Sequence, residues 1–233
     1  MEIKKNFDIK STIIEVMGKN DHATAPVRFH LPFDTQQLSQ LLGVCYKAEV
    51  IKRVDPAKYQ NLNQEMKTNI TRVAKWLCDP NKRPGLLLYG GVGTGKTTLL
   101  QAMVYVINKA CCKEKDENGK SVETLNGKPI AIVKAKEIVK ASFIEPNRYD
   151  LMTNTTLLAI DELGVEPVES KLFGNTSEPI VDLLCERYDR QRCTLISTNL
   201  SSEIILERYG KRVSDRFNEM FTAVPFTAES YRV

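Results

Sequence analysis

The chain has 233 residues, of which 42% are hydrophobic and 27% charged, and its formal net charge is +4. This length allows one α/β domain with a buried core and a short additional segment, but not two ordinary domains. The mild positive charge permits contact with nucleic acid without indicating it. The first residues contain no apolar signal-peptide region, and no stretch approaches the roughly 20 apolar residues of a membrane span. Because the six cysteines form no CxxC pair, we expect reduced thiols, no zinc site and a cytoplasmic protein.

Residues 1–55 are expected to form an N-terminal appendage whose candidate role is partner binding. Side chains of alternating character predict a strand over residues 27–31. Two short helices are expected to follow. Asp34 is the candidate N-cap of the first, which Gly43 would end, and the second would end at Asp55 before Pro56. This boundary leaves residues 56–233 as the main domain.

Strands and helices are predicted to alternate through the main domain. Apolar spacings of three and four predict a helix over residues 62–77, and the apolar run at 86–89 predicts a strand buried on both faces. Further strands are expected at 129–133, 156–160 and 194–197, and further helices at 97–109 and 178–190. The polar segment 111–128 reads as an exposed hairpin or loop, and residues 135–156 have room for one helix and a connecting loop. This alternation predicts a doubly wound parallel sheet flanked by helices.

The strongest motif is GGVGTGKT, a complete GxxxxGK[ST] pattern between a predicted strand and a predicted helix. Glycines let backbone N–H groups approach phosphates, and the helix N-terminus adds positive potential. Lys96 would reach the β and γ phosphates, and the Thr97 hydroxyl would bind Mg²⁺. The residues expected to bind nucleotide are Gly90, Gly91, Val92, Gly93, Thr94, Gly95, Lys96, Thr97 and Thr98.

A second motif, LLAIDE, is an apolar strand that ends in two carboxylates, as a Walker B motif does. Asp161 is expected to hold Mg²⁺ through water, and Glu162 to orient or activate the attacking water. Without the P-loop, the same dipeptide would read as a solvated strand end or a helix cap.

A third strand ends in Ser197, Thr198 and Asn199. If this strand is parallel to the others, Asn199 lies at the same sheet edge and can hydrogen-bond the γ-phosphate or the lytic water, the role called sensor 1. The alternative is an ordinary cap for the helix that starts near Ser201.

Four motifs in order, GLLLYGGVGTGKTTL, LLAIDELGVEP, TLISTNL and RYGKRVSDRF, resemble the AAA+ domain of DnaC-type helicase loaders and IstB-type transposition ATPases. The resemblance spans about residue 59 to the end of the chain and implies a P-loop NTPase fold with a short or absent lid domain. It implies that residues 56–233 are an AAA+ ATPase domain. It assigns Arg216 as an arginine finger that acts on a neighbouring subunit, with Arg212 one turn before it. Arg232, in a C-terminal Ser-Tyr-Arg, is the candidate sensor 2 residue that binds nucleotide in cis.

A local ion pair with Asp215 or Glu207 remains the alternative for Arg216. A frayed end of the chain remains the alternative for Arg232.

The resemblance implies an ATPase that binds ATP with Mg²⁺, assembles into a ring or spiral and acts in DNA replication as a helicase loader. Its implied partners are a replicative helicase and single-stranded DNA. The basic residues that could face DNA are Lys134, Lys136, Lys140 and Arg148, unless they merely form a solvated helix face. The alternatives are an IstB-like helper of DNA transposition with a transposase partner, a nucleotide-responsive scaffold and a small-molecule kinase.

Overall fold

Five parallel strands form the central sheet in the order β2-β3-β6-β1-β7. They are β1 (Gly85–Gly90), β2 (Ile132–Lys134), β3 (Leu157–Leu163), β6 (Cys193–Thr198) and β7 (Phe221–Phe226). The computed structural model describes residues 28–52, 62–111, 130–172 and 175–228. Because all pairs are parallel, the loops that follow the strands meet at one edge of the sheet. The predicted parallel α/β fold is therefore confirmed.

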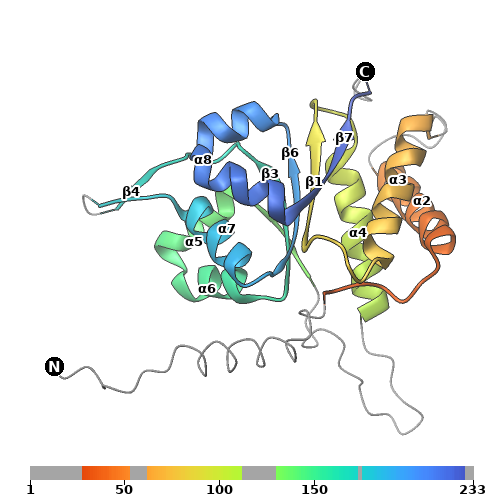
Figure 1. Cartoon of the computed structure of the whole chain (residues 1–233), viewed down its shortest axis with the longest axis horizontal. Coiled ribbons are helices and arrows are strands. Elements are labelled where there is room, and N and C mark those ends of the chain that lie inside the picture. Colours follow the sequence, from red (N-terminus) through yellow and green to blue (C-terminus); the bar gives the residue numbers. More distant parts are fainter. Residues whose placement is uncertain (1–27, 53–61, 112–129, 173–174, 229–233) are drawn as a thin grey trace, which may run out of the picture.

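Helices cover both faces of this sheet (Figure 1). One layer contains α2 (Thr35–Ile51), α3 (Gln64–Cys78) and α4 (Lys96–Cys111). The other contains α5 (Ala135–Ile144), α6 (Pro146–Asn154), α7 (Pro179–Asp189) and α8 (Ser202–Met220). In β1, Leu86 and Leu88 pack into the core beneath the first layer, whereas Leu87 packs into the core beneath the second. Side chains of a strand alternate between faces, so an uninterrupted apolar run builds both cores.

The N-terminal segment differs from the prediction in its local structure. Residues 28–31 form no strand, although the Leu31 amide donates to the Leu77 carbonyl at 2.8 Å. Asp34 does cap α2, but the helix continues through Gly43 to Ile51 as one element. A helical glycine costs about 1 kcal/mol relative to alanine, and the burial of several α2 side chains on both sides of it outweighs this cost. Those buried residues are Leu38, Leu42, Cys45 and Tyr46.

The α2 helix shares the core of α3 and α4. The division between residues 1–55 and 56–233 stays a prediction, because the residues around it lie outside the described part of the chain.

Two helices, not one, occupy the segment between β2 and β3. The chain leaves helical geometry at Glu145, where φ is −138° and ψ is 60°, and α6 begins at Pro146. Proline is favoured in the first turn of a helix because it has no N–H to lose, and it disfavours helical geometry in the residue before it. The expectation of one helix and a loop was wrong because Pro146 was not read as a helix start.

The remaining connections include a hairpin and a kinked helix. The short strands β4 (Ser170–Leu172) and β5 (Asn175–Ser177) pair antiparallel. The helix α8 bends at Gly210, where φ is +78°. The predicted hairpin or loop at 111–128 lies outside the described residues apart from its first residue. Among the described helices, none combines the length and apolar character that a membrane span requires.

Candidate nucleotide-binding site

The glycine-rich turn lies between β1 and α4, at the sheet edge where the strands end. Three of its glycines have positive φ: Gly90 at 141°, Gly93 at 82° and Gly95 at 91°. Residues with a side chain rarely adopt a positive φ, so glycine is required to fold the turn tightly. At Gly90 a Cβ atom would also overlap the carbonyl of Phe226 in β7. The structure thus has the strand, turn and helix that the motif predicts.

Lys96, the first residue of α4, points back into this turn. Its Nζ donates to the carbonyl oxygens of Gly90 at 2.8 Å and Gly91 at 2.5 Å, and it lies 3.4 Å from Thr94 Oγ1. Lys96 is 6% exposed, and Thr94, which donates to the Gly91 carbonyl, is also buried. The loop therefore encloses the ammonium group near the N-terminus of α4, where an anion would also be favoured.

A side-chain hydrogen bond joins the P-loop to the Walker B strand. Thr97 Oγ1 donates to Asp161 Oδ1 at 2.9 Å, and the Ser197 hydroxyl donates to the same carboxylate oxygen. Asp161 is 4% exposed and Ser197 is 2% exposed. A hydroxyl and a carboxylate are hard oxygen ligands of the kind that Mg²⁺ takes. These residues therefore fit a magnesium ion, and Ser197 is a support for Asp161 that the sequence analysis did not single out.

Glu162 lies in an unusual backbone conformation beside this cluster. Its φ is +59°, and the β3–β6 register shifts between Ile160 and Leu163, so Glu162 lies at a bulge. Its amide donates to Ser197 Oγ at 3.1 Å. A non-glycine residue with positive φ at a strand end is often a feature of functional sites, where bulges re-aim a side chain. The bulge separates the two adjacent carboxylates, so that Asp161 is buried while the Glu162 side chain is 42% exposed.

Lys134, at the end of β2, forms an ion pair with Glu162. Its Nζ lies 3.1 Å from Glu162 Oε2. The hydrogen bond to this carboxylate, followed by its charge, raises the pKa of the Lys134 ammonium group. Lys134 was predicted as a candidate DNA contact; it has this local partner, and the DNA contact stays a prediction.

Asn199 directly follows β6, which lies between β1 and β3 in the sheet. It is exposed, and no hydrogen bond engages its side chain among the described residues. The adjacent Thr198 links the ends of β6 and β3, since its hydroxyl donates to the Leu163 carbonyl at 2.6 Å. Asn199 thus has the predicted position between the two motifs, and its role as sensor 1 stays a prediction.

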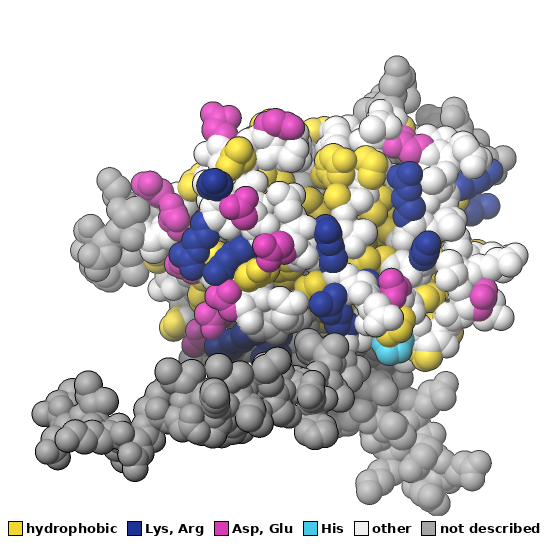
Figure 2. Space-filling model, in the orientation of Figure 1, with side chains coloured by type: hydrophobic (Ala, Val, Ile, Leu, Met, Phe, Trp, Pro, Cys, Tyr) yellow, Lys and Arg dark blue, Asp and Glu magenta, His cyan; other side chains and the backbone are white. Residues whose placement is uncertain are grey.

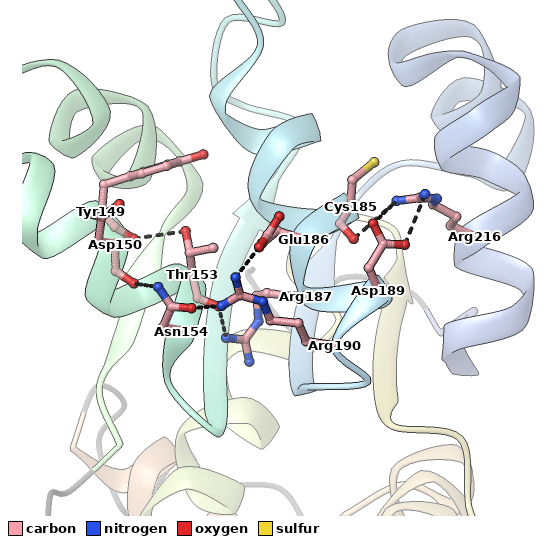
Figure 3. Close-up of polar contacts among 10 residues, drawn as sticks. All are labelled: Tyr149, Asp150, Thr153, Asn154, Cys185, Glu186, Arg187, Asp189, Arg190 and Arg216. Carbon is pink, nitrogen blue, oxygen red and sulfur yellow. Dashed lines mark hydrogen bonds and ion pairs between the residues drawn. The ribbon is translucent and has the colours of Figure 1, made fainter. Parts of the chain in front are cut away.

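Arg216 lies at the opposite edge of the sheet from its own P-loop. It contacts the last turns of α7, just before β6 begins. It also lies shortly before Phe221, the first residue of β7, which pairs with the first residue of β1. Arg216 is therefore at the end of the sheet where the strands begin, whereas the P-loop is at the end where they finish. Its guanidinium forms an ion pair with Asp189 at 3.1 Å (Figure 3). A local ion pair was the alternative for Arg216, and the structure has one, with Asp189 in place of Asp215 or Glu207; the role of Arg216 as a finger stays a prediction. Arg232 lies outside the described residues, so its predicted role is not tested.

On the face drawn in Figure 2, the basic side chains of the described residues form no continuous stripe. Figure 2 shows Lys and Arg side chains interspersed with Asp and Glu on the face seen in Figure 1. Arg148 pairs with Glu137 at 3.8 Å and Glu145 at 3.3 Å, whereas Lys136 and Lys140 are exposed on α5. The predicted contact with single-stranded DNA is not tested by this arrangement.

Two buried residues of the N-terminal half, Tyr46 and Met66, pack against Gly95 of the P-loop. A Cβ atom at Gly95 would overlap the hydroxyl of Tyr46 in α2 and lie 2.9 Å from Met66 Cε in α3. Tyr46 is 4% exposed and Met66 is 2% exposed. Because the motif says nothing about what packs beneath it, no sequence signal links these two side chains to the P-loop.

A buried carboxylate ties the loop after β3 to α8. Glu166 accepts from the Gly164 amide at 2.8 Å and from the Tyr209 hydroxyl, and it lies 3.9 Å from the Arg208 guanidinium. Burial, followed by the hydrogen bond to Glu166, raises the pKa of Tyr209. The Walker B loop is thereby fixed to the first half of α8, just before the kink at Gly210.

The parallel sheet, the P-loop turn and the Walker B carboxylates together give the chain the fold of AAA+ P-loop NTPases. Among solved structures, the chain is similar to the DnaC helicase loader, with a TM-score of 0.53 and 19% identity over 72% of this chain and 93% of that one. It is similar to DnaI, with a TM-score of 0.55 and 19% identity over 79% of this chain and 93% of that one. AMPPCP-bound DnaA from Aquifex aeolicus has a TM-score of 0.50 and 16% identity, over 70% of this chain and 47% of that one.

In sequence, the replication factor C large subunit of Thermoplasma acidophilum is 23% identical over 164 residues, which are 68% of this chain. The match covers 39% of that relative, so the chain spans about two fifths of its length. No profile of a known protein family matches the chain. The chain therefore has the AAA+ fold, and DnaC-type helicase loaders are among its structural neighbours, as the sequence motifs predicted.

Proposed function

We propose that this protein is an AAA+ ATPase that binds ATP with Mg²⁺, assembles with further copies of itself and acts in DNA replication in the manner of a helicase loader. The observation that carries the proposal is the contact between Thr97 of the P-loop and Asp161 of the Walker B strand at 2.9 Å. A glycine-rich turn alone could be structural, whereas its contact with a buried carboxylate on a separate strand is what nucleotide and metal binding require. The similarity to the DnaC helicase loader supports the proposed process.

In this proposal the chain's own residues position ATP and the attacking water. Lys96 exchanges the carbonyl oxygens of its own loop for phosphate oxygens, and the backbone N–H groups of the turn bind the same phosphates. Thr97, and Asp161 through water, would hold a magnesium ion, which would neutralise charge on the phosphates. Glu162, aimed away from Asp161 by the bulge, orients the water, and Asn199 contacts the water or the γ-phosphate.

Arg216 can complete only a neighbouring site in this proposal, because it lies at the sheet edge opposite its own P-loop. A finger of this kind can raise turnover by about 10³-fold or more through stabilising charge in the transition state. We therefore propose that turnover depends on assembly. The natural partners in this role are a replicative helicase and single-stranded DNA.

The first experiment measures ATP turnover against protein concentration, without DNA and with single-stranded or duplex DNA, at two salt concentrations. We expect specific activity to rise with protein concentration and to rise further with single-stranded DNA, with the DNA effect weaker at higher salt. Preference for duplex DNA would favour an IstB-like role in transposition instead. Turnover that is independent of both concentration and DNA would refute assembly and the loader role.

Variants separate the steps of the proposed reaction. Lys96→Ala should lose ATP binding, measured by equilibrium titration with a fluorescent ATP analogue.

Glu162→Gln should retain ATP affinity and lose about 10²-fold or more in turnover, with Glu137→Gln as a control that removes a similar exposed carboxylate elsewhere. Normal ATP affinity in the first variant would remove the P-loop assignment, and normal turnover in the second would remove the role of Glu162.

Mixing two inactive variants tests the trans arrangement of Arg216. An assembly of Arg216→Ala and Lys96→Ala subunits contains sites that join an intact P-loop to an intact arginine. We expect the mixture to regain turnover that neither variant has alone. Failure to regain activity at high concentration, when each variant still assembles, would exclude the trans model.

A further inference from the structure

The guanidinium of Arg216 is held by the last turns of α7 (Figure 3). Its two terminal nitrogens face the Asp189 carboxylate at 3.1 and 3.4 Å, and one of them also donates to the Cys185 carbonyl at 3.1 Å. The group stacks over the Tyr188 ring, 4.8 Å from its centroid. The Arg216 side chain is 21% exposed. In this position its charge is neutralised within its own subunit.

The helix that carries Asp189 is anchored to the body of the domain by a buried arginine. Arg187 is fully buried, and it donates to three carbonyls that precede β3 and to the Cys193 carbonyl at the start of β6. Burial lowers the pKa of its guanidinium to about 9, which leaves the group charged at neutral pH. This network fixes α7 against the sheet. Asp189 therefore cannot follow Arg216 if that side chain extends toward another subunit.

A finger needs its guanidinium free to face phosphate oxygens, and here the same donors are already used. We propose that Asp189 sequesters Arg216 in the free subunit, so that this ion pair must open before Arg216 can reach ATP bound to a neighbouring copy. This inference rests on the proposed role of Arg216 and adds its regulation.

A γ-phosphate carries more negative charge than one carboxylate, so it can displace Asp189 from the guanidinium, and the loss of that phosphate on hydrolysis lets the original pair reform. The pair is weak enough to open, because the Asp189 side chain is 53% exposed.

The packing of α7 against α8 does not depend on the ion pair. Beside Arg216 the two helices enclose a small hollow with apolar walls, to which Leu184, Val213, Phe217 and Met220 contribute. Each of these four residues is at most 7% exposed. Removing the charge of Asp189 should therefore leave the fold intact and free the arginine.

The test compares ATP turnover against protein concentration for the wild-type protein, Asp189→Asn, Glu186→Gln and Arg216→Ala. Glu186 is the matched control, because it lies on the same helix and pairs at its surface with Arg190 instead. Unfolding temperatures establish that each variant is folded. We expect Asp189→Asn to reach half-maximal turnover at a protein concentration about 2- to 5-fold lower than wild type, and Glu186→Gln to match wild type.

The double variant Asp189→Asn with Arg216→Ala separates the two ideas under test. It should behave as Arg216→Ala alone, because without the arginine there is nothing to release. If Arg216→Ala turns over ATP as fast as wild type, the finger role is wrong and the sequestration is wrong with it. If Arg216→Ala is impaired but Asp189→Asn matches wild type or needs more protein, the finger role stands and sequestration is overturned.

Discussion

Substituting Gly95 by alanine probes whether the N-terminal helix supports the P-loop. The new Cβ atom would overlap the hydroxyl of Tyr46 and lie 2.9 Å from Met66 Cε, at a residue whose φ is +91°. Positive φ costs a non-glycine residue about 1–2 kcal/mol. Overpacking a buried site costs a further ~1–3 kcal/mol. The sum is about 2–5 kcal/mol, a large part of the stability of an ordinary domain.

Urea unfolding of four proteins measures this cost: wild type, Gly95→Ala, Tyr46→Phe and the double variant. Tyr46→Phe removes the hydroxyl that the new methyl group would meet, so we expect the double variant to regain about 1 kcal/mol relative to the sum of the two single changes. We also expect Gly95→Ala to lose ATP binding, because its methyl group enters the proposed phosphate-binding turn. Stability within about 0.5 kcal/mol of wild type, or strict additivity of the two changes, would refute the contact between α2 and the P-loop.

Three further predictions concern stability and the site. Burial lowers the pKa of the Lys82 ammonium from 10.5 to about 8. At a pH between these two pKa values, Lys82 is protonated in the unfolded chain and neutral in the folded protein. The free energy of unfolding should therefore rise with pH across this range, by up to about 3 kcal/mol. Unfolding at several pH values should show this rise in wild type and its loss in Lys82→Met. Gly210→Ala should destabilise the protein by about 1–3 kcal/mol through backbone strain alone, since a Cβ there meets no atom within 4 Å; an unchanged unfolding midpoint would contradict the kink. Ser197→Ala should lower kcat by roughly 10-fold or more with little change in ATP affinity, because its hydroxyl holds the Asp161 carboxylate and the Glu162 amide; equal losses in both quantities would indicate a binding role instead.

Much of the fold could be predicted because each element carries a local signal. The apolar run before the P-loop can be accommodated only between two layers of helices, and it does contribute to both cores. Local signals failed where long-range packing decided the outcome. Gly43 reads as a helix stop, but burial of residues on both sides of it carries α2 through the glycine. Pro146 begins a helix that composition alone did not separate from α5.

The candidate site was predictable to a similar extent. Glycine-rich turns and carboxylates at strand ends are recognisable in sequence because their chemistry needs those residue types at that spacing. The side chains that hold them are ordinary residues with no such spacing. Ser197 supports Asp161 from a neighbouring strand, and Lys134 faces Glu162 from another. Their roles follow from the order of strands in the sheet, which no single segment encodes.

The sequence by itself determined that the chain has a P-loop, a pair of Walker B carboxylates and the alternating elements of an α/β domain, because each depends on residues close together in the chain. Only the tertiary structure decided that Asp161 meets Thr97, and that Arg216 lies across the sheet from its own P-loop, beside Asp189. Those relations join residues that are distant in sequence. They depend on strand order and on the packing of α7 against α8, which the whole chain determines together.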